Sequence, residues 1–186
     1  MLERPGSALA FFVLGVLAAA LCLTLKSSAP EMAEVRPVWR EVKWSFPADQ
    51  WGRGKAFHCA AVACGTEVEV LLRAKIGFCN CTTGVNDDPE LERVADLDLF
   101  GEARMAPASG HVIAVRWMKG RSRGYSFPGS SGSAQSVLAI AFNDHCDALV
   151  ATVVAGNNRP AELEPVVLEF LNGDVVFHWA EVALGL

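Results

Sequence analysis

The sequence predicts an α+β fold in which an N-terminal hydrophobic helix precedes one domain with a mainly antiparallel sheet and about two packed helices. Several short segments alternate apolar and polar residues with the two-residue period of a strand, whereas only two segments show the spacing of an amphipathic helix. Short polar or glycine-containing turns connect most neighbouring strand segments, and such connections favour antiparallel hairpins.

The N-terminal helix is predicted from residues 8–25, an apolar run without a charged residue, which Arg4 precedes and Lys26 follows. The run reaches the roughly 17–25 residues that a membrane-spanning helix needs. It exceeds the roughly 7–15 apolar residues of most signal peptides. We therefore expect residues 1–26 to be a signal anchor or, alternatively, a cleaved signal peptide. An anchor contacts the cell membrane through residues 8–25 and holds the domain outside the cytoplasm, whereas cleavage gives a secreted or periplasmic protein.

Residues 27–37 are small, polar and flanked by prolines, which is typical of a linker, and residues 38–186 form the predicted exported α+β domain. Setting aside Arg4, Lys26 and Glu3 leaves 14 of the 16 basic and 20 of the 21 acidic side chains. A net acidic domain argues against nucleic acid or an anionic lipid surface as a partner, because both require clustered Lys and Arg.

The first strand of the domain is expected over residues 38–46, where apolar and polar residues alternate, and a glycine-containing loop over residues 49–54 follows it. The clearest strand spans residues 66–73, in which Val68 and Leu72 belong to one apolar face.

A helix is expected to begin within residues 86–100. Either Asp87 or Asp88 is suited to accept hydrogen bonds from the first free N–H groups, and Pro89 suits the first turn. Gly101 is the predicted end of this helix.

A strand is expected over residues 111–118, with residues 125–128 as its hairpin partner. The intervening residues contain Lys119, Arg121 and Arg123 among glycines. We expect these three basic side chains to lie in a solvated hairpin turn rather than in a binding patch.

Two further apolar strands are predicted over residues 137–142 and 148–155, joined by a polar turn over residues 143–147. Residues 160–171 show the spacing of an amphipathic helix with one buried face. The tail over residues 174–186 is too apolar to be a free end, and we expect a short turn followed by a terminal strand that docks on the sheet.

Five cysteines follow the leader, and export makes disulfides chemically plausible. Cys59 and Cys64 precede the clearest strand and Cys79 and Cys81 follow it, so a reversal of the chain brings these four disulfide candidates together. Three pairings are possible, and the sequence leaves them open, including a local Cys59–Cys64 bridge. Because five is an odd number, one cysteine remains outside a disulfide, and we expect Cys146 to be this free thiol.

The same four cysteines suggest a metal site as an alternative. Four thiolates bind zinc or copper(I), and a histidine beside a cysteine adds a nitrogen ligand. The spacing differs from the paired Cys-x2-Cys of a zinc ribbon, so we assign no cofactor and keep zinc or copper as the alternative. The residues of this alternative site are Cys59, Cys64, Cys79, Cys81 and His58.

No catalytic residue is assigned from the sequence. The surroundings of His58 and Ser131 resemble those of chymotrypsin-like enzymes, and Asp96 or Asp98 lies between them in the order that such a triad needs. The exported part is too short for the two barrels of that family, and both aspartates fall on a predicted helix. Asp87 and Asp88 after Asn86, and Asp96 with Asp98, are better explained by helix capping and a solvated face than by calcium binding.

The sequence therefore predicts a membrane-tethered or exported, disulfide-stabilised domain that binds an unidentified protein or small ligand, and the pattern favours a non-enzymatic role. The alternative function is a metal- or thiol-handling protein that uses Cys59, Cys64, Cys79 and Cys81.

We expect the natively expressed protein to retain its full-length mass and to sediment with membranes, because residues 8–25 are long enough to span a bilayer. Intact-mass spectrometry of the membrane and soluble fractions checks this prediction. A soluble protein that lacks the mass of the leader would instead establish cleavage.

Overall fold

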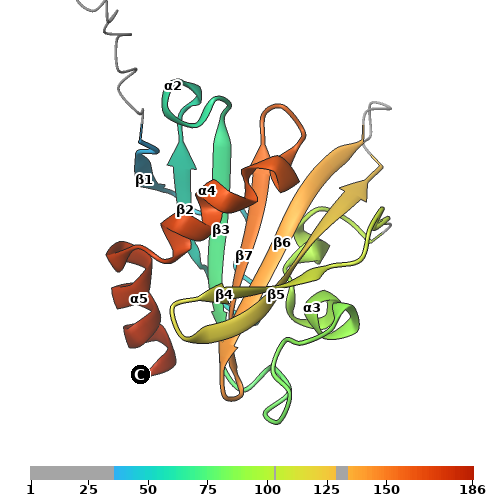
Figure 1. The fold of residues 1–186 in the computed structure, drawn as a ribbon, viewed down its shortest axis with the longest axis vertical. Helices are drawn as coiled ribbons and strands as arrows, with labels where there is room; N and C mark the ends of the chain where they lie inside the picture. The colour runs from blue at the N-terminus through green and yellow to red at the C-terminus, as the bar shows by residue number, and fades with distance from the viewer. Residues whose placement is uncertain (1–35, 103, 129–133) are drawn as a thin grey trace, which may run out of the picture. The chain divides into compact units, whose positions relative to one another are not determined.

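The sheet at the centre of the structure has seven strands, and every neighbouring pair of strands is antiparallel. A computed structural model describes residues 36–102, 104–128 and 134–186 (Figure 1), so the predicted hydrophobic helix and nearly all of the linker lie outside the described residues. No helix within these three ranges is long and apolar enough to cross a membrane. The α+β class and the antiparallel sheet are confirmed.

The strands lie in the order β1-β2-β3-β7-β6-β5-β4 across the sheet. Their bounds are β1 Trp39–Val42, β2 Lys55–Cys59, β3 Val68–Lys75, β4 His111–Val115, β5 Met118–Phe127, β6 Gln135–Asp144 and β7 Asp147–Ala155. The α-helices are α2 Ala61–Cys64, α3 Asp88–Val94, α4 Glu164–Leu171 and α5 Asp174–Leu184, and the 3-10 helices are η1 Leu97–Leu99 and η2 Pro160–Leu163.

A layer of helices and loops covers each face of the sheet. Alternate residues of β6 show this division, because Leu138 and Ile140 belong to the core under α4 and α5, whereas Val137 and Ala139 belong to the core under α3. In Figure 1, α4 crosses the near face of the sheet and α5 follows it at the left side of the strands. Strands buried on both faces read as continuous apolar runs, which explains why residues 137–142 and 148–155 were recognisable as strands.

The predicted helix over residues 160–171 divides into η2 and α4. Pro165 lies in the first turn of α4, where the absence of an N–H group has no cost, so the α-helix begins at Glu164. Val167 and Leu171 then pack against the sheet four residues apart.

The prediction of a terminal strand over residues 174–186 is wrong, because this segment forms α5. Val176, Ala180 and Leu184 recur every four residues and bury one stripe of the helix against the core. Gly185 adopts φ 70° and ends the helix in the left-handed conformation that glycine favours.

The helix predicted from residue 86 is confirmed at its beginning, where the Asp87 carboxylate accepts a hydrogen bond from the backbone N–H of Glu90 at 2.8 Å. It ends earlier than expected, at Val94. The chain turns there, so that Asp96 is buried before the short η1 begins.

The hairpin between β4 and β5 turns at residues 116–117, which corrects the prediction for the three basic residues. Lys119, Arg121 and Arg123 all lie on β5 rather than in a turn. The Arg121 guanidinium binds the Asp88 carboxylate, and Arg123 Nη1 lies 2.9 Å from Glu92 Oε1, so both arginines connect β5 to α3.

The strand β2 and the one-turn helix α2 carry no clear periodic pattern and were not predicted. In β2, Ala56, Phe57 and Cys59 are buried. The strand predicted over residues 38–46 is shorter than expected, since β1 ends at Val42.

We expect Gly120→Ala to lower the free energy of unfolding by about 1–3 kcal/mol, the usual cost of overpacking. A Cβ at Gly120 would clash with the carbonyl oxygen of Ala141 on the neighbouring strand. Gly124→Ala on the same strand is the matched control, because its nearest neighbour is Ala161 Cβ at 3.9 Å. Urea denaturation of both variants measures the difference, and equal stabilities would contradict the packing of β5 against β6.

Candidate functional site

Two hollows on opposite faces of the sheet are the candidate sites, together with a cluster of cysteines. The first hollow is a polar pocket of about 410 Å³ at the end of β3, on the face that carries α3. Its lining comes from the loop before β2, from the end of β3 and from η1 with the residues before it. The lining residues are Asp49, Gln50, Trp51, Lys75, Ala95, Asp96, Asp98 and Leu99.

Buried ion pairs form the inner wall of this polar pocket. Lys75 Nζ lies 2.8 Å from Asp96 Oδ1, and Arg73 Nε lies 3.3 Å from Asp96 Oδ2. Arg73, Lys75 and Asp96 expose only 1%, 4% and 6% of their surface. Two cations at such depth require nearby carboxylates, because an unpaired buried charge is strongly destabilising.

Asp49 provides the second carboxylate, with its Oδ2 accepting a hydrogen bond from Arg73 Nη1 at 2.6 Å. Burial opposes ionisation of Asp49, but the hydrogen bonds from Arg73 and from the Trp51 backbone N–H outweigh it and lower the pKa of Asp49. Aromatic rings complete the cluster, since the Arg73 guanidinium lies 4.7 Å from the Trp44 ring centroid and Lys75 Nζ lies 5.5 Å from that of Trp51.

This ion-pair cluster links β3 to the segment that precedes η1. The alternation of β3 was recognisable in the sequence, but the burial of its polar face at Arg73 and Lys75 was not. Two cationic residues at the end of an apolar strand are the sequence feature that indicates such buried ion pairs. The two cations of the cluster face two carboxylates, so its charges balance. We therefore interpret the cluster as a structural ion-pair network.

The second hollow is a groove of about 370 Å³ between β1 and the α4–α5 corner, which we call the apolar groove. Its floor is aromatic. The Trp39 ring stacks on Phe170 with 4.5 Å between centroids, and Phe57 meets Phe170 edge-on at 4.9 Å. Val166 and Val175 add aliphatic walls, and Val175 is 66% exposed.

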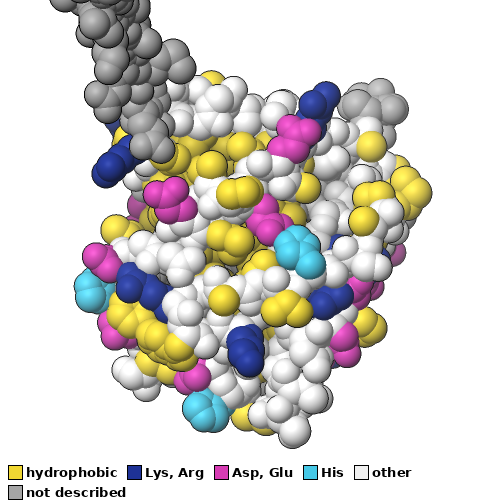
Figure 2. All heavy atoms as spheres, in the orientation of Figure 1, with side chains coloured by type: hydrophobic (Ala, Val, Ile, Leu, Met, Phe, Trp, Pro, Cys, Tyr) yellow, Lys and Arg dark blue, Asp and Glu magenta, His cyan; other side chains and the backbone are white. Residues whose placement is uncertain are grey.

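Charged side chains surround the apolar groove, and they are mostly acidic. Three carboxylates and one guanidinium line it, from Glu41, Glu169, Asp174 and Arg36. Glu41 pairs with Lys55 at 2.6 Å and Asp174 with Arg116 at 2.7 Å. Glu169 makes no ion pair with any residue in the described part of the chain. Figure 2 shows this face, with apolar side chains exposed beside α4 and acidic side chains among them.

The local Cys59–Cys64 bridge is one of the pairings that the sequence left open, whereas the other three cysteines differ from the expectation. Cys59 is bonded to Cys64 and Cys81 to Cys146, whereas Cys79 is a buried thiol. The roles expected for Cys79 and Cys146 are therefore exchanged. The pairing of Cys81 with Cys146 depends on the tertiary structure, because the two-residue turn between β6 and β7 brings Cys146 against the loop that contains Cys81.

The structure does not bring together the cysteines of the alternative metal site. Cys59 pairs across the sheet with Val68 at the start of β3, whereas Cys79 and Cys81 follow the end of β3. No group of three or more His, Cys, Asp or Glu side chains among the described residues is arranged to hold a metal ion. Zinc and copper therefore gain no support from the geometry.

His58, the remaining ligand candidate, lies on β2 with its Nε2 2.5 Å from Glu67 Oε2. A hydrogen bond from the Ala61 backbone N–H and the contact with His58 lower the pKa of Glu67. The triad considered for hydrolysis has no support here, because Asp96 pairs with Arg73 and Lys75. Ser131 lies outside the described residues.

Comparison with models of protein families, with curated proteins and with solved structures finds no match for this chain.

We expect Asp96→Asn to lower the free energy of unfolding by about 3–5 kcal/mol, because it leaves Arg73 and Lys75 buried without their shared carboxylate. Asp98→Asn at the exposed rim is the control, with an expected change within about 0.5 kcal/mol. Denaturant unfolding of both variants measures the effects. A loss below about 1 kcal/mol for Asp96→Asn would show that the ion pairs contribute little.

Proposed function

We propose that this protein is a membrane-tethered, disulfide-stabilised domain that acts outside the cytoplasm and binds an extended segment of a partner protein in the apolar groove. The observation that carries this proposal is the aromatic floor of the groove, between a sheet edge and a helix corner, in which Trp39 and Phe170 are half-buried and Phe57 is buried beside Phe170. Clustered aromatic side chains are the usual anchors of protein interfaces.

The shape of the apolar groove favours an extended peptide. β1 is an edge strand of only four residues, so one side of its backbone has no neighbouring strand within the described sheet. An extended segment that lies along such an edge places alternate side chains toward the groove. The branched side chains Val166 and Val175 line the groove beside Phe170, where they would contact an apolar side chain of the segment.

The charge of the groove favours a basic partner segment. The lining has three carboxylates against one guanidinium, and Glu169 is the carboxylate without an ion pair among the described residues. A Lys or Arg beside the apolar anchor complements this rim and increases the rate of association. The proposed ligand is therefore a segment with an aromatic or branched apolar residue next to a basic residue.

The proposed location outside the cytoplasm is supported by the apolar run over residues 8–25 and by the disulfides. Stable disulfides persist in oxidising compartments, and two bridges are present in a domain of ordinary size. The linker over residues 27–37 leads from the apolar run to Arg36 and Pro37, which themselves line the groove.

A phage-displayed library of random twelve-residue peptides, selected on the domain, tests the proposal. We expect enriched peptides to combine an apolar anchor with a basic residue. Val175→Lys should weaken their binding at least tenfold, because it places a cation at the wall of the groove, where Val175 is 66% exposed.

Val182→Lys is the matched control, since Val182 is 85% exposed on the same helix but does not line the groove. It should leave the affinity unchanged. Peptides that bind both variants equally, or a selection without enrichment, would overturn the assignment of the groove.

A further inference from the structure

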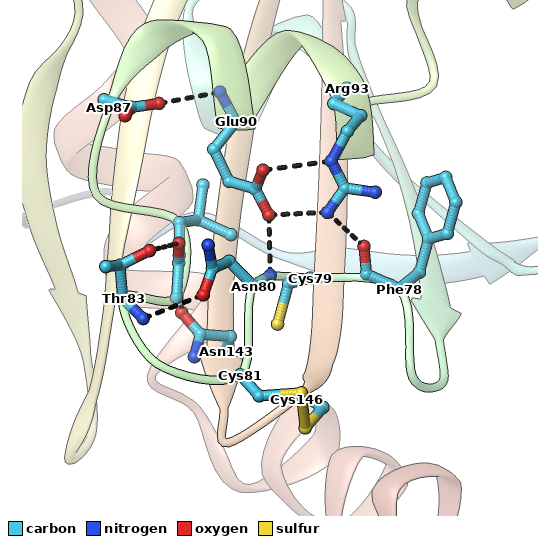
Figure 3. A network of polar contacts seen from close by, with 12 residues as sticks. Phe78, Cys79, Asn80, Cys81, Thr83, Asp87, Glu90, Arg93, Asn143 and Cys146 are labelled. Atoms are coloured by element: carbon cyan, nitrogen blue, oxygen red, sulfur yellow. Dashed lines mark hydrogen bonds and ion pairs between the residues drawn. A yellow bond between two sulfur atoms is a disulfide. The ribbon is translucent and has the colours of Figure 1, made fainter.

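Three cysteines meet at the tip of the hairpin formed by β6 and β7. Cys79 and Cys81 lie on the segment that leaves β3, and Cys146 lies in the hairpin turn beside His145. Cys81 is bonded to Cys146, and Cys79 is the one cysteine in the described ranges outside a disulfide. Figure 3 shows the Cys79 thiol pointing toward the side of the loop on which the Cys81–Cys146 bridge lies.

Cys79 is positioned directly against the hairpin turn. Its backbone N–H donates to the carbonyl oxygen of Cys146 at 3.0 Å, and its thiol donates to the carbonyl oxygen of His145 at 3.3 Å. These two bonds place Cys79 directly beside Cys146, the residue to which Cys81 is bonded. A disulfide forms between cysteines that are close neighbours in the fold, with Cα atoms about 4.4–6.8 Å apart, so Cys79 is the candidate for a second partner of Cys146.

Hydrogen bonds on two sides hold the segment that carries Cys79 and Cys81. The backbone N–H of Asn80 donates to Glu90 Oε1 at 2.7 Å, and Arg93 of α3 donates to the carbonyl oxygen of Phe78. The Asn143 amide donates to the carbonyl oxygen of His145 at 3.0 Å and steadies the hairpin turn. Figure 3 shows the contacts of Glu90 with Asn80 and of Arg93 with Phe78. The loop and the hairpin turn therefore keep their relative position while the disulfide changes from one cysteine to the other.

We propose that Cys79, Cys81 and Cys146 form a thiol–disulfide exchange site in which the free thiol moves between Cys79 and Cys81. The thiolate of Cys79 attacks Cys146 Sγ, the Cys79–Cys146 bond forms, and the Cys81–Cys146 bond breaks. The proton of Cys79 passes to solvent, and the Cys81 thiolate that leaves takes a proton back. One disulfide replaces another, so no oxidant or reductant is consumed.

The exchange changes the accessibility of the thiol. Cys79 is 5% exposed, whereas Cys81 belongs to an exposed loop and lines a surface pocket of about 290 Å³ with Lys119 and His145. The cation of Lys119 favours a thiolate at Cys81. The isomer with a free Cys81 therefore presents a reactive thiol to a disulfide of a partner molecule, which the isomer with a free Cys79 does not.

The ionisation of Cys79 controls the rate of this exchange. Burial, and to a lesser extent the carboxylates of Glu90 and Asp147, raise the pKa of Cys79 above its ordinary value of 9.0. Only the thiolate attacks a disulfide, so the exchange is slow at neutral pH and accelerates about tenfold per pH unit below that pKa.

Alkylation of the oxidised domain without denaturant or reductant tests the proposal. The protein is incubated with N-ethylmaleimide at pH 7, 8 and 9, quenched with acid, digested with pepsin and mapped by mass spectrometry. We expect the label on Cys81 together with a Cys79–Cys146 bridge, at a rate that rises with pH. A label confined to Cys79, or protein that stays unlabelled at pH 9, would overturn the proposal.

Two variants separate exchange from simple exposure of Cys79. Cys81→Ser should form a Cys79–Cys146 disulfide and contain no free thiol among these residues, because Cys146 has only one remaining partner in range. Cys79→Ser retains the Cys81–Cys146 bridge and should remain unlabelled at every pH. A folded Cys81→Ser protein with two free thiols would contradict the proposal, and the mapping of the unaltered protein decides the matter if this variant does not fold.

Discussion

The burial of β6 and β7 on both faces is the constraint on which the rest of the structure depends. Every residue from Val137 to Phe142 is buried, so the sheet cannot present either face of its centre to water. A layer must therefore cover each side. The near layer is made by α4 and α5 at the end of the chain, and the far layer is made by α3, η1 and the loops around them.

The far layer contains little regular structure, since α3 has only seven residues, and this explains the ion pairs. Among the described residues, the short η1 is the helical segment that lines the pocket at the end of β3, and the long stems of Arg73 and Lys75 add apolar cover there. Their charged ends then lie beneath Trp44 and Trp51, where Asp96 and Asp49 neutralise them. The polar pocket is thus a consequence of how this face of the sheet is covered. The apolar groove is not part of that covering layer.

The sequence predicts the parts of the fold that depend on local patterns. The strands β6 and β7, the cap of α3 at Asp87 and the burial of Val167 follow from composition and spacing. The helix α5 was missed because its valines have strand propensity, and only the packing of Val176 and Ala180 against the sheet decides its state. The apolar groove was not predictable, because Trp39 and Phe170 are far apart in the chain and meet only after folding.

The bridge between Cys81 and Cys146 has a topological consequence. It joins two residues that are 65 positions apart and so closes a covalent ring that contains α3, β4, β5 and β6. A protease that cuts once inside this ring, for example in the segment before β4, leaves two fragments that remain one molecule. The same holds when Cys79 replaces Cys81, so a single cut inside the ring in an oxidising medium leaves the two fragments covalently linked.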